Sequence, residues 1–319
     1  MSDISLSRSD LGTVRDTIMP HLHRTAVRHS RTLSALAGCR VHLKEELFQK
    51  TGSYKPRGML WALRQLDEER LQRGVITFSA GNAAQGLAFA ARLAGTKATV
   101  VMPATASPIK AQATREYGAE VILYGTPKEC LEHCRSLAET RGLSFVSSYD
   151  DVDLMAGHAT LGLEILEDLP TVRAIVVGIG GGGMAGGLVL AAQACSHTVR
   201  LVGVEPTGAP AMKRSLEAGK PVRLESVNTI ADGLAAPGAG ERCFELVRKR
   251  FEEVVLVEDP AIVEAMKLLM SRCKLFAEPA GSAALAGLLS MKGKFGPDED
   301  VVCVVSGGNL DFERLQRLL

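Results

Sequence analysis

The sequence predicts an α/β protein built from two parallel-sheet units with a ligand cleft between them. Short apolar strands and helical segments alternate strictly from residue 74 to 148, and the alternation resumes after residue 157. Several of these strands end in turns rich in glycine, asparagine or serine, at the edge where α/β sheets bind ligands. With 319 residues, 46% of them apolar, the chain suits one large or two modest domains. We therefore expect a smaller unit over 74–148 and a larger unit made of 1–73 and 149–319.

The elements follow from hydrophobic periodicity. In the first 73 residues we expect a helix over 10–19, a strand over 39–48 and a helix over 58–73. In the smaller unit the strands are expected over 74–79, 96–103, 119–125 and 143–148, and the helices over 80–95, 107–118 and 128–142. After a loop over 149–157, the remaining strands are expected over 173–179, 199–206 and 300–308, and the helices over 158–169, 180–195, 259–275 and 282–293.

Lys55 lies between two residues that favour loops, Gly52 and Pro56, so we expect it in a loop that joins a strand to a helix. A lysine amine that is held partly deprotonated can form a Schiff base with a carbonyl compound. Most lysines, however, are solvated surface charges. Whether Lys55 is a reactive amine or a surface charge is decided by the chemistry of the other loops of the chain. In the following helix, Trp61 is on the apolar face and is expected to pack in the core.

Composition excludes several classes of protein. The net charge of +1, from 37 basic and 36 acidic residues, gives no electrostatic reason to expect nucleic acid or an anionic membrane as partner. No apolar run is long enough to span a bilayer, and the N-terminus is too polar for a signal peptide. The seven cysteines contain no CxxC pair and no zinc spacing, and Cys130 and Cys134 are expected to be two small core or surface thiols on one helix face. These features predict a reduced, cytoplasmic protein.

Gly180, Gly181, Gly182 and Gly183 follow a buried strand and open a helix that begins with Met184. Without side chains, successive backbone N–H groups can converge on an anion at the positive end of the helix, which favours a phosphate site. A flexible turn is the alternative. A dinucleotide-binding pattern can be forced onto these glycines, but the expected acidic residue is not at its usual spacing.

Two further turns carry polar side chains. The stretch from Ser79 to Gln85 contains Asn82, whose amide could donate to a phenolate-like oxygen, although Ser and Asn are also common helix caps. Ser306 ends the last buried strand in the motif SGGN, where its hydroxyl could bond a ring nitrogen; as an isolated motif SGGN is an ordinary turn.

Together these segments resemble one family. GSYKPRG around Lys55, SAGNAAQG, GGGGMAGG, VEP (204–206), ADG (231–233), EPAG (278–281) and SGGN occur in the order found in the fold type II pyridoxal phosphate enzymes. Within that fold, which is like the tryptophan synthase β subunit, the sequence is similar to the threonine and serine dehydratases and serine racemases. The motifs span about 20–310, nearly the whole chain.

The resemblance implies a pyridoxal 5′-phosphate site between the two units, with Lys55 as the Schiff-base lysine and general base. It places the phosphate in the Gly180–Gly183 loop with Met184 behind it, Asn82 on the 3′-oxygen and Ser306 on the pyridine nitrogen. Tyr54, where the family usually has phenylalanine, is expected to stack near the ring. The implied cofactor-binding residues are therefore Lys55, Tyr54, Asn82, Gly180, Gly181, Gly182, Gly183, Met184, Gly233, Glu278 and Ser306.

The implied activity is that of an ammonia-lyase for L-threonine, L-serine or both. Lys55 removes the α-proton, the β-hydroxyl is eliminated, and the product hydrolyses to a 2-oxo acid and ammonia. Ser79, with the amides of Asn82 and Ala83, is expected to hold the substrate carboxylate. Other reactions of the fold are alternatives: racemisation, β-replacement, or dehydration of another β-hydroxy amino acid such as hydroxyaspartate. A sensor without catalysis and a nicotinamide-dependent oxidoreductase are alternatives from other classes.

Several positions depart from the family pattern. Ala80 replaces the serine of racemases, so we expect little racemisation, because alanine cannot move a proton. Glu205 matches one ligand of a metal site found in relatives, but Ala211 replaces the last ligand, so no metal is expected. Ala83 replaces a histidine and His158 a glutamine, and His158 is expected to be a packed polar group. The chain ends soon after SGGN, so we expect no C-terminal regulatory domain, and the family suggests a homodimer.

Overall fold

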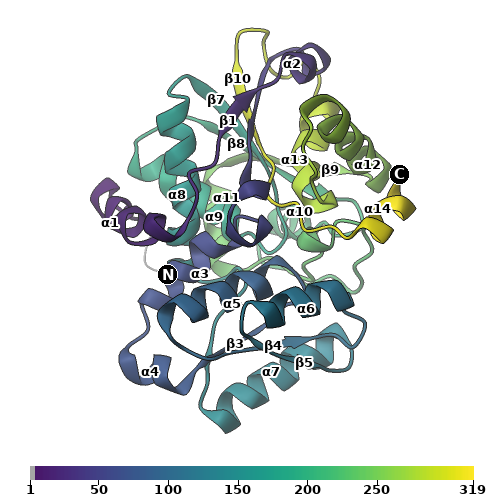
Figure 1. The fold of residues 1–319 in the computed structure, drawn as a ribbon. Helices are drawn as coiled ribbons and strands as arrows, with labels where there is room; N and C mark the ends of the chain where they lie inside the picture. Colours follow the sequence, from purple (N-terminus) through teal and green to yellow (C-terminus); the bar gives the residue numbers. More distant parts are fainter. Residues whose placement is uncertain (1–3) are drawn as a thin grey trace.

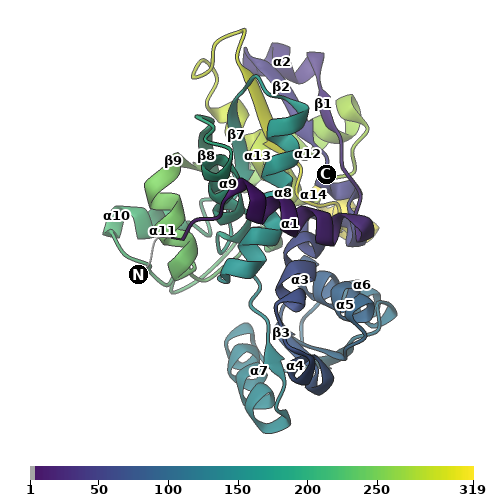
Figure 2. The ribbon, with the colours of Figure 1, turned by 90° about the vertical axis from the view of Figure 1, so that its left-hand side faces the viewer.

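The computed structural model describes residues 4–319 and contains two sheets, each flanked by helices. Residues 1–3, which belong to the polar N-terminal stretch and to the predicted larger unit, lie outside the described residues. In Figure 1 the sheet that contains β3, β4 and β5 lies below the larger sheet, and α3 and α5 run along the junction between them. Figure 2 shows the same two bodies from the side, with α7 on the outer face of the lower one. The predicted two-sheet α/β fold is confirmed.

The larger sheet has six strands in the order β1-β2-β10-β7-β8-β9, and the smaller has four in the order β5-β4-β3-β6. The strands of the larger sheet are β1 (Val27–His29), β2 (Arg40–Lys44), β7 (Val172–Gly178), β8 (Arg200–Pro206), β9 (Phe251–Val257) and β10 (Asp300–Val304). The strands of the smaller sheet are β3 (Val75–Phe78), β4 (Ala98–Met102), β5 (Glu120–Leu123) and β6 (Ser144–Phe145).

The helices cover both faces of these sheets. In the first half of the chain they are α1 (Arg8–Ile18), α2 (Arg31–Ala37), α3 (Lys55–Arg64), α4 (Glu68–Arg73), α5 (Asn82–Ala94), α6 (Pro108–Glu116) and α7 (Pro127–Arg141). In the second half they are α8 (Val152–Asp168), α9 (Gly183–Ala194), α10 (Ala211–Ala218), α11 (Glu241–Arg250), α12 (Asp259–Leu268), α13 (Pro279–Ser290) and α14 (Phe312–Leu318). None of the helices in residues 4–319 is both long and apolar enough to cross a membrane.

Among the described strands, β1 and β2 form the one antiparallel pair, and the other neighbours are parallel. Parallel strands need helices on both faces, so their sequences are apolar on both sides. The burial of β4 and β10 at every residue agrees with this. Because parallel strands point the same way, β2, β7 and β10 deliver their following loops to one edge of the larger sheet.

Several predicted element boundaries are wrong. Lys55 is the first residue of α3 instead of a loop residue, because a proline just after a helix start is compatible with the first turn. The helix expected over 58–73 is two helices, separated at Asp67, which caps α4. The loop expected over 149–157 ends early, because Asp151 caps α8 at Val152.

The segments outside the predicted elements hold α2, α10, α11, α14, β1 and β9. β9 is an edge strand with only Val254 and Val257 buried, so its sequence lacks the continuous apolar run of a central strand. The strand expected over 39–48 ends at Lys44 and is followed by a short 3₁₀ turn, Glu46–Phe48. These misses lie at edges and short polar helices, where periodicity carries little signal.

Candidate functional site

Lys55 sits where α3 meets α5. Its Nζ donates a hydrogen bond to the backbone oxygen of Ser148, 3.0 Å away, and lies 5.0 Å from the centre of the Tyr54 ring. Its side chain has no carboxylate partner among residues 4–319. α5 packs closely against Lys55 at Gly86. A Cβ at Gly86 would lie 3.1 Å from the Lys55 Cβ, so glycine permits this approach. The amine is therefore held without a counterion, as a lysine that reacts with a carbonyl requires.

The helix that begins at Lys55 is anchored by a buried cluster of charges, which we call the Arg57 network: Arg57, Lys44, Glu46 and Glu164. Arg57 binds Glu46 and Glu164 at 2.8 Å each, and Lys44 binds Glu164 at 2.6 Å. All four side chains have 0% exposure. Burial opposes the charge on Arg57, but the two carboxylates prevail and hold its pKa above the usual value.

The glycine loop between β7 and α9 leaves no room for side chains. A Cβ at Gly181 would lie 2.2 Å from the Tyr149 ring, and one at Gly182, whose φ is +105°, would lie 2.6 Å from the Cys243 Cβ. A Cβ at Gly180 would meet the backbone oxygen of Gly233 at 3.2 Å. The loop and the ADG segment are thus adjacent, and glycine in the loop leaves its backbone N–H groups unobstructed by side chains of their own, as an anion site at a helix start requires.

Asn82 begins α5 and reaches across to the larger unit. Its Nδ2 donates to Glu278 Oε1 at 2.5 Å, and its Oδ1 accepts from Asn309 Nδ2 at 2.8 Å. Ser306, 6% exposed, follows β10 by two residues, and its backbone oxygen accepts from the Tyr54 N–H. A backbone bridge pairs Ser53 with Gly307. The SAGN, GSYK, EPAG and SGGN motifs therefore converge on one place.

The residues expected to hold a substrate carboxylate lie at the β3–α5 turn. Ser79 Oγ accepts a hydrogen bond from the Gly81 N–H, and Ala83 is buried in the first turn of α5. Asn82 and Ala83 both lie at the amino end of this helix, where free backbone N–H groups favour an anion. Met184 is the second residue of α9, behind the glycine loop, and is 4% exposed.

Two titratable groups near the site have displaced pKa values. Burial raises the pKa of Glu278 to about 7, with the attraction of Lys110 opposing it. Burial and the positive charges of Lys55 and Arg57 hold the pKa of His158 well below its usual range. His158 is fully buried against Tyr54, with ring centres 4.8 Å apart. His158 is therefore packed as expected, but neither of its ring nitrogens has a hydrogen-bond partner among the described residues.

Glu205, which matches a metal ligand of relatives, is used differently here. Its two carboxylate oxygens accept from the backbone N–H groups of Met212 and Lys213, at 2.7 and 2.8 Å, and so cap α10. Ala211 is the first residue of that helix. Burial nevertheless raises the pKa of Glu205 to about 7.

Sequence reasoning missed the Arg57 network and a contact between the units, in which Lys110 of α6 donates to Asp232 at 2.6 Å. Arg314 binds the same carboxylate oxygen at 2.8 Å. One signal was available for the network. Glu164 interrupts the apolar run 161–166, and a carboxylate there requires a buried partner. Lys110 and Asp232 carry no comparable signal.

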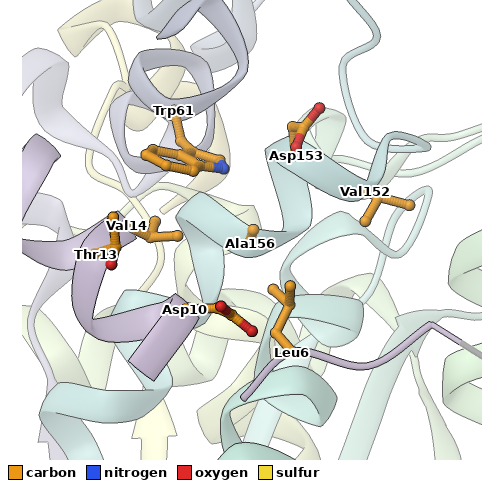
Figure 3. Close-up of a pocket in the computed structure, with 8 residues that line it drawn as sticks. All are labelled: Leu6, Asp10, Thr13, Val14, Trp61, Val152, Asp153 and Ala156. Atoms are coloured by element: carbon orange, nitrogen blue, oxygen red, sulfur yellow. The ribbon is translucent and has the colours of Figure 1, made fainter. Parts of the chain in front are cut away.

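Figure 3 shows a pocket of about 200 Å³ on another part of the molecule, between α1, α3 and α8. Its lining includes Trp61, Asp10 and Asp153, and it contains none of the predicted site residues. Trp61 is half-buried at this pocket, so the prediction that it packs fully in the core is only partly right. We place the candidate site at Lys55 because the motifs converge there.

The residues present fit pyridoxal phosphate. The cradle of Gly180–Gly183 suits a phosphate, and Lys55 carries a free amine. Next to Lys55, the buried hydroxyls of Thr51 and Ser53 lack hydrogen-bond partners within the described part of the chain. Unsatisfied buried hydroxyls at a convergence of motifs indicate a missing polar ligand.

The similarities to known proteins cover both sheets. A model of pyridoxal-phosphate dependent enzymes matches residues 18–307. An L-threonine ammonia-lyase of Thermotoga maritima is 39% identical over 318 residues, 98% of this chain and 78% of the relative. An L-threo-3-hydroxyaspartate ammonia-lyase of Pseudomonas sp is 42% identical over 298 residues, 93% of each chain. The structure of maize serine racemase superposes with a TM-score of 0.93 at 34% identity, covering 99% of this chain and 97% of that one.

Proposed function

Because the chain belongs to the family of pyridoxal-phosphate-dependent enzymes, we propose that it converts L-threonine, L-serine or both into a 2-oxo acid and ammonia. Membership confirms the resemblance, the cofactor and the enzyme class, a lyase, that the motifs predicted. The observation that carries the proposal is Lys55, whose amine has no carboxylate partner in residues 4–319 and lies where the cofactor motifs converge.

Each residue has a role that follows from its position. Lys55 holds the cofactor and moves the α-proton, and the backbone of Gly180–Gly183 binds the phosphate. Asn82 would donate to the 3′-oxygen, and Ser306 would present a neutral hydroxyl to the ring nitrogen. Tyr54, Met184, Gly233 and Glu278 complete the cofactor site, and Ser79 with the amides of Asn82 and Ala83 binds the substrate carboxylate. When bound, pyridoxal phosphate withdraws electrons from the substrate Cα, which makes its proton removable.

Two related reactions are less well supported. Racemisation needs an acid or base on the second face of the ring, and Ala80 has no proton to give. A hydroxyaspartate carries a second carboxylate, which favours a free cation nearby. Lys110 and Arg314 both already bind Asp232. The similarity to a hydroxyaspartate ammonia-lyase nevertheless makes this substrate the comparison to include in any assay.

The smaller unit, 74–148, is proposed to move as one body against the rest of the chain. The four strands of its sheet all lie between Val75 and Phe145, and the chain crosses to the larger unit at each end. Closing such a unit over substrate excludes water from the reaction.

A homodimer and a cytoplasmic location complete the proposal. Phe48 and Phe276 are 55% and 40% exposed, and both belong to segments that approach Gly308, through Leu47 and through the backbone oxygen of Phe276. Large exposed aromatic side chains favour a protein interface. The seven cysteines are all free thiols, which is the state that a reducing compartment maintains.

The test is product formation by the purified protein loaded with pyridoxal phosphate. We expect 2-oxobutyrate and ammonia from L-threonine, or pyruvate and ammonia from L-serine, faster than ammonia from L-threo-3-hydroxyaspartate. Lys55→Ala should abolish both colour and turnover, whereas Lys128→Ala, at an exposed position on α7, should change neither. A coloured protein that is inert to threonine and serine but active on hydroxyaspartate would refute the substrate assignment.

A further inference from the structure

Asn82 is an amide side chain, and its two ends are chemically opposite. Its oxygen accepts hydrogen bonds and its nitrogen donates two. If the oxygen faced the cofactor, Asn82 could not donate to the 3′-oxygen as the proposed function requires. The neighbours of Asn82 must therefore decide which end faces the ring.

The orientation of the Asn82 amide follows from a backbone carbonyl oxygen, which can accept a hydrogen bond but cannot donate one. Asn309 Nδ2 lies 2.7 Å from the oxygen of Thr51, so Asn309 must present its nitrogen there. The second N–H of the same nitrogen points to Asn82 Oδ1, 2.8 Å away, so Asn82 must present its oxygen to Asn309. The Asn82 nitrogen is left on the other side, where one N–H binds Glu278 Oε1 at 2.5 Å.

Two glycines make room for this chain of hydrogen bonds. A Cβ at Gly52 would lie 2.5 Å from Asn309 Oδ1. A Cβ at Gly307 would lie 2.5 Å from Glu278 Oε1 and 3.1 Å from Asn82 Nδ2. Gly52 belongs to the Lys55 motif and Gly307 to the SGGN motif, so glycine at both places has a common physical cause.

We propose that Asn309 is a positioning residue that fixes the polarity of the Asn82 amide, so that one N–H of Asn82 remains free to donate to the cofactor 3′-oxygen. Glu278 completes the arrangement by taking the other N–H, so it acts on the cofactor through Asn82. Asn82 lies on α5, whereas Thr51, Glu278 and Asn309 lie on the larger unit. The donor is therefore correctly oriented only while α5 is docked against that unit. This inference rests on the proposed function.

The test compares the absorbance spectrum and the cofactor affinity of the loaded protein, without substrate, in variants of Asn309, Asn82 and Gly307. Asn309→Asp keeps the shape of the side chain but removes both N–H donors. We expect it to shift the visible band of the bound cofactor in the same direction as Asn82→Ala and to weaken cofactor binding roughly fivefold, as the loss of one hydrogen bond would. The double variant should be no worse than Asn82→Ala, because both changes remove the same donor.

A second variant avoids any new charge. Gly307→Ala has no polar atom, yet its Cβ would intrude between Asn82 and Glu278, so it should produce the same spectral shift. Asn228→Asp, outside the site, is the control and should leave the spectrum unchanged. Thermal denaturation of each apoprotein identifies variants that fail to fold.

The outcomes separate the two proposals. A wild-type protein that never acquires colour would refute the cofactor role itself. If wild type and Asn309→Asp share one spectrum and one affinity while Asn82→Ala differs from both, Asn82 still donates but Asn309 does not orient it, and the inference is overturned. Additive effects of the two substitutions would overturn it as well.

Discussion

Beneath Lys55, four fully buried side chains are paired with opposite charges at 2.6–2.8 Å, whereas across the site Lys110 meets Asp232, whose side chain is 40% exposed. The first arrangement, the Arg57 network, joins β2, α3 and α8 within the larger unit. The second joins α6 of the smaller unit to the ADG segment of the larger one. Both distances are short, so geometry alone does not distinguish the two.

Burial does distinguish them. No water can replace a partner lost from the Arg57 network, so the network specifies a single position for the start of α3 and for Lys55. Lys110 is buried but Asp232 is partly solvated, so water and ions can replace Lys110 at the carboxylate, and this contact can open at a lower cost than the network. The side of the site that carries the reacting amine is therefore rigid, and the side that carries Asn82 is held by exchangeable contacts.

The largest effect is expected from Arg57→Met, which leaves the carboxylates of Glu46 and Glu164 buried without a counterion. We expect a loss of about 3–5 kcal/mol in the free energy of unfolding of the apoprotein, measured by urea denaturation. Arg70→Met, on the exposed face of α4, should change it by less than about 0.5 kcal/mol. A loss for Arg57→Met as small as that of the control would show that the network does not anchor α3.

Glu278→Gln is the next in size, and its effect depends on pH. The pKa of Glu278 is raised from 4.5 to about 7 in the folded protein, so the folded state holds this proton more tightly than the unfolded state. The resulting stability is fully present below pH 4.5 and is lost as the pH rises through 7. Over this interval the loss is about 3 kcal/mol.

Glutamine does not titrate, so the Glu278→Gln variant should not show this loss of about 3 kcal/mol between pH 4.5 and 8. Denaturation curves of the two apoproteins at several pH values measure the difference. Glu205, whose pKa is also raised to about 7, is present in both proteins and cancels in the comparison. Identical pH dependence in the two proteins would mean that Glu278 is already ionised at pH 5.

Lys110→Met should cost only about 1 kcal/mol of global stability, because its partner is partly solvated. Its main effect should be local: faster amide hydrogen exchange in α5 and α6, with exchange in α3 unchanged. High ionic strength should produce the same pattern in the wild type. Lys128→Met is the control on α7. Uniformly faster exchange in both units would argue against an exchangeable contact at this position.

The smallest effect is expected at His158. Replacing it with leucine removes two buried nitrogens that have no partner in residues 4–319, so we expect a change between zero and a gain of about 1 kcal/mol. Thr160→Val is the matched substitution on the same helix. It removes a hydroxyl that accepts from Arg57 at 3.1 Å and donates to Gly157 at 2.7 Å, so it should destabilise. A larger loss at His158 than at Thr160 would reveal a bound water or an unrecognised partner.

The same contrast explains what the sequence could predict. The segments that carry Lys55, Asn82, Gly180–Gly183 and Ser306 are local motifs that follow buried strands, so their meeting at one edge of the sheets could be predicted. The chemical roles assigned to these residues stay predictions. The position of Lys55 within α3 could not be predicted, because Pro56 suits a loop as well as a first helical turn.

Contacts between residues that are far apart in the sequence could not be predicted. Arg57 and Glu164 are 107 positions apart, Lys44 and Glu164 are 120, and Asn82 and Asn309 are 227. Only the folded chain shows which charges and amides meet, because hydrophobic periodicity fixes the face of a helix but not its partner. For Glu164 the sequence does indicate a buried cation as partner, because a carboxylate within an apolar run requires one, but it does not indicate which cation.

The order of strands in the larger sheet has a consequence for synthesis on the ribosome. β10, made last, lies between β2, made early, and β7. The sheet therefore stays split until residue 304 has emerged, whereas every strand of the smaller sheet is available by residue 145. The nascent chain can complete the smaller sheet first, but Ser306 and Asn309 join Lys55 only at the end. A chain stalled before β10 would expose two unpaired strand edges and would depend on chaperones to avoid aggregation.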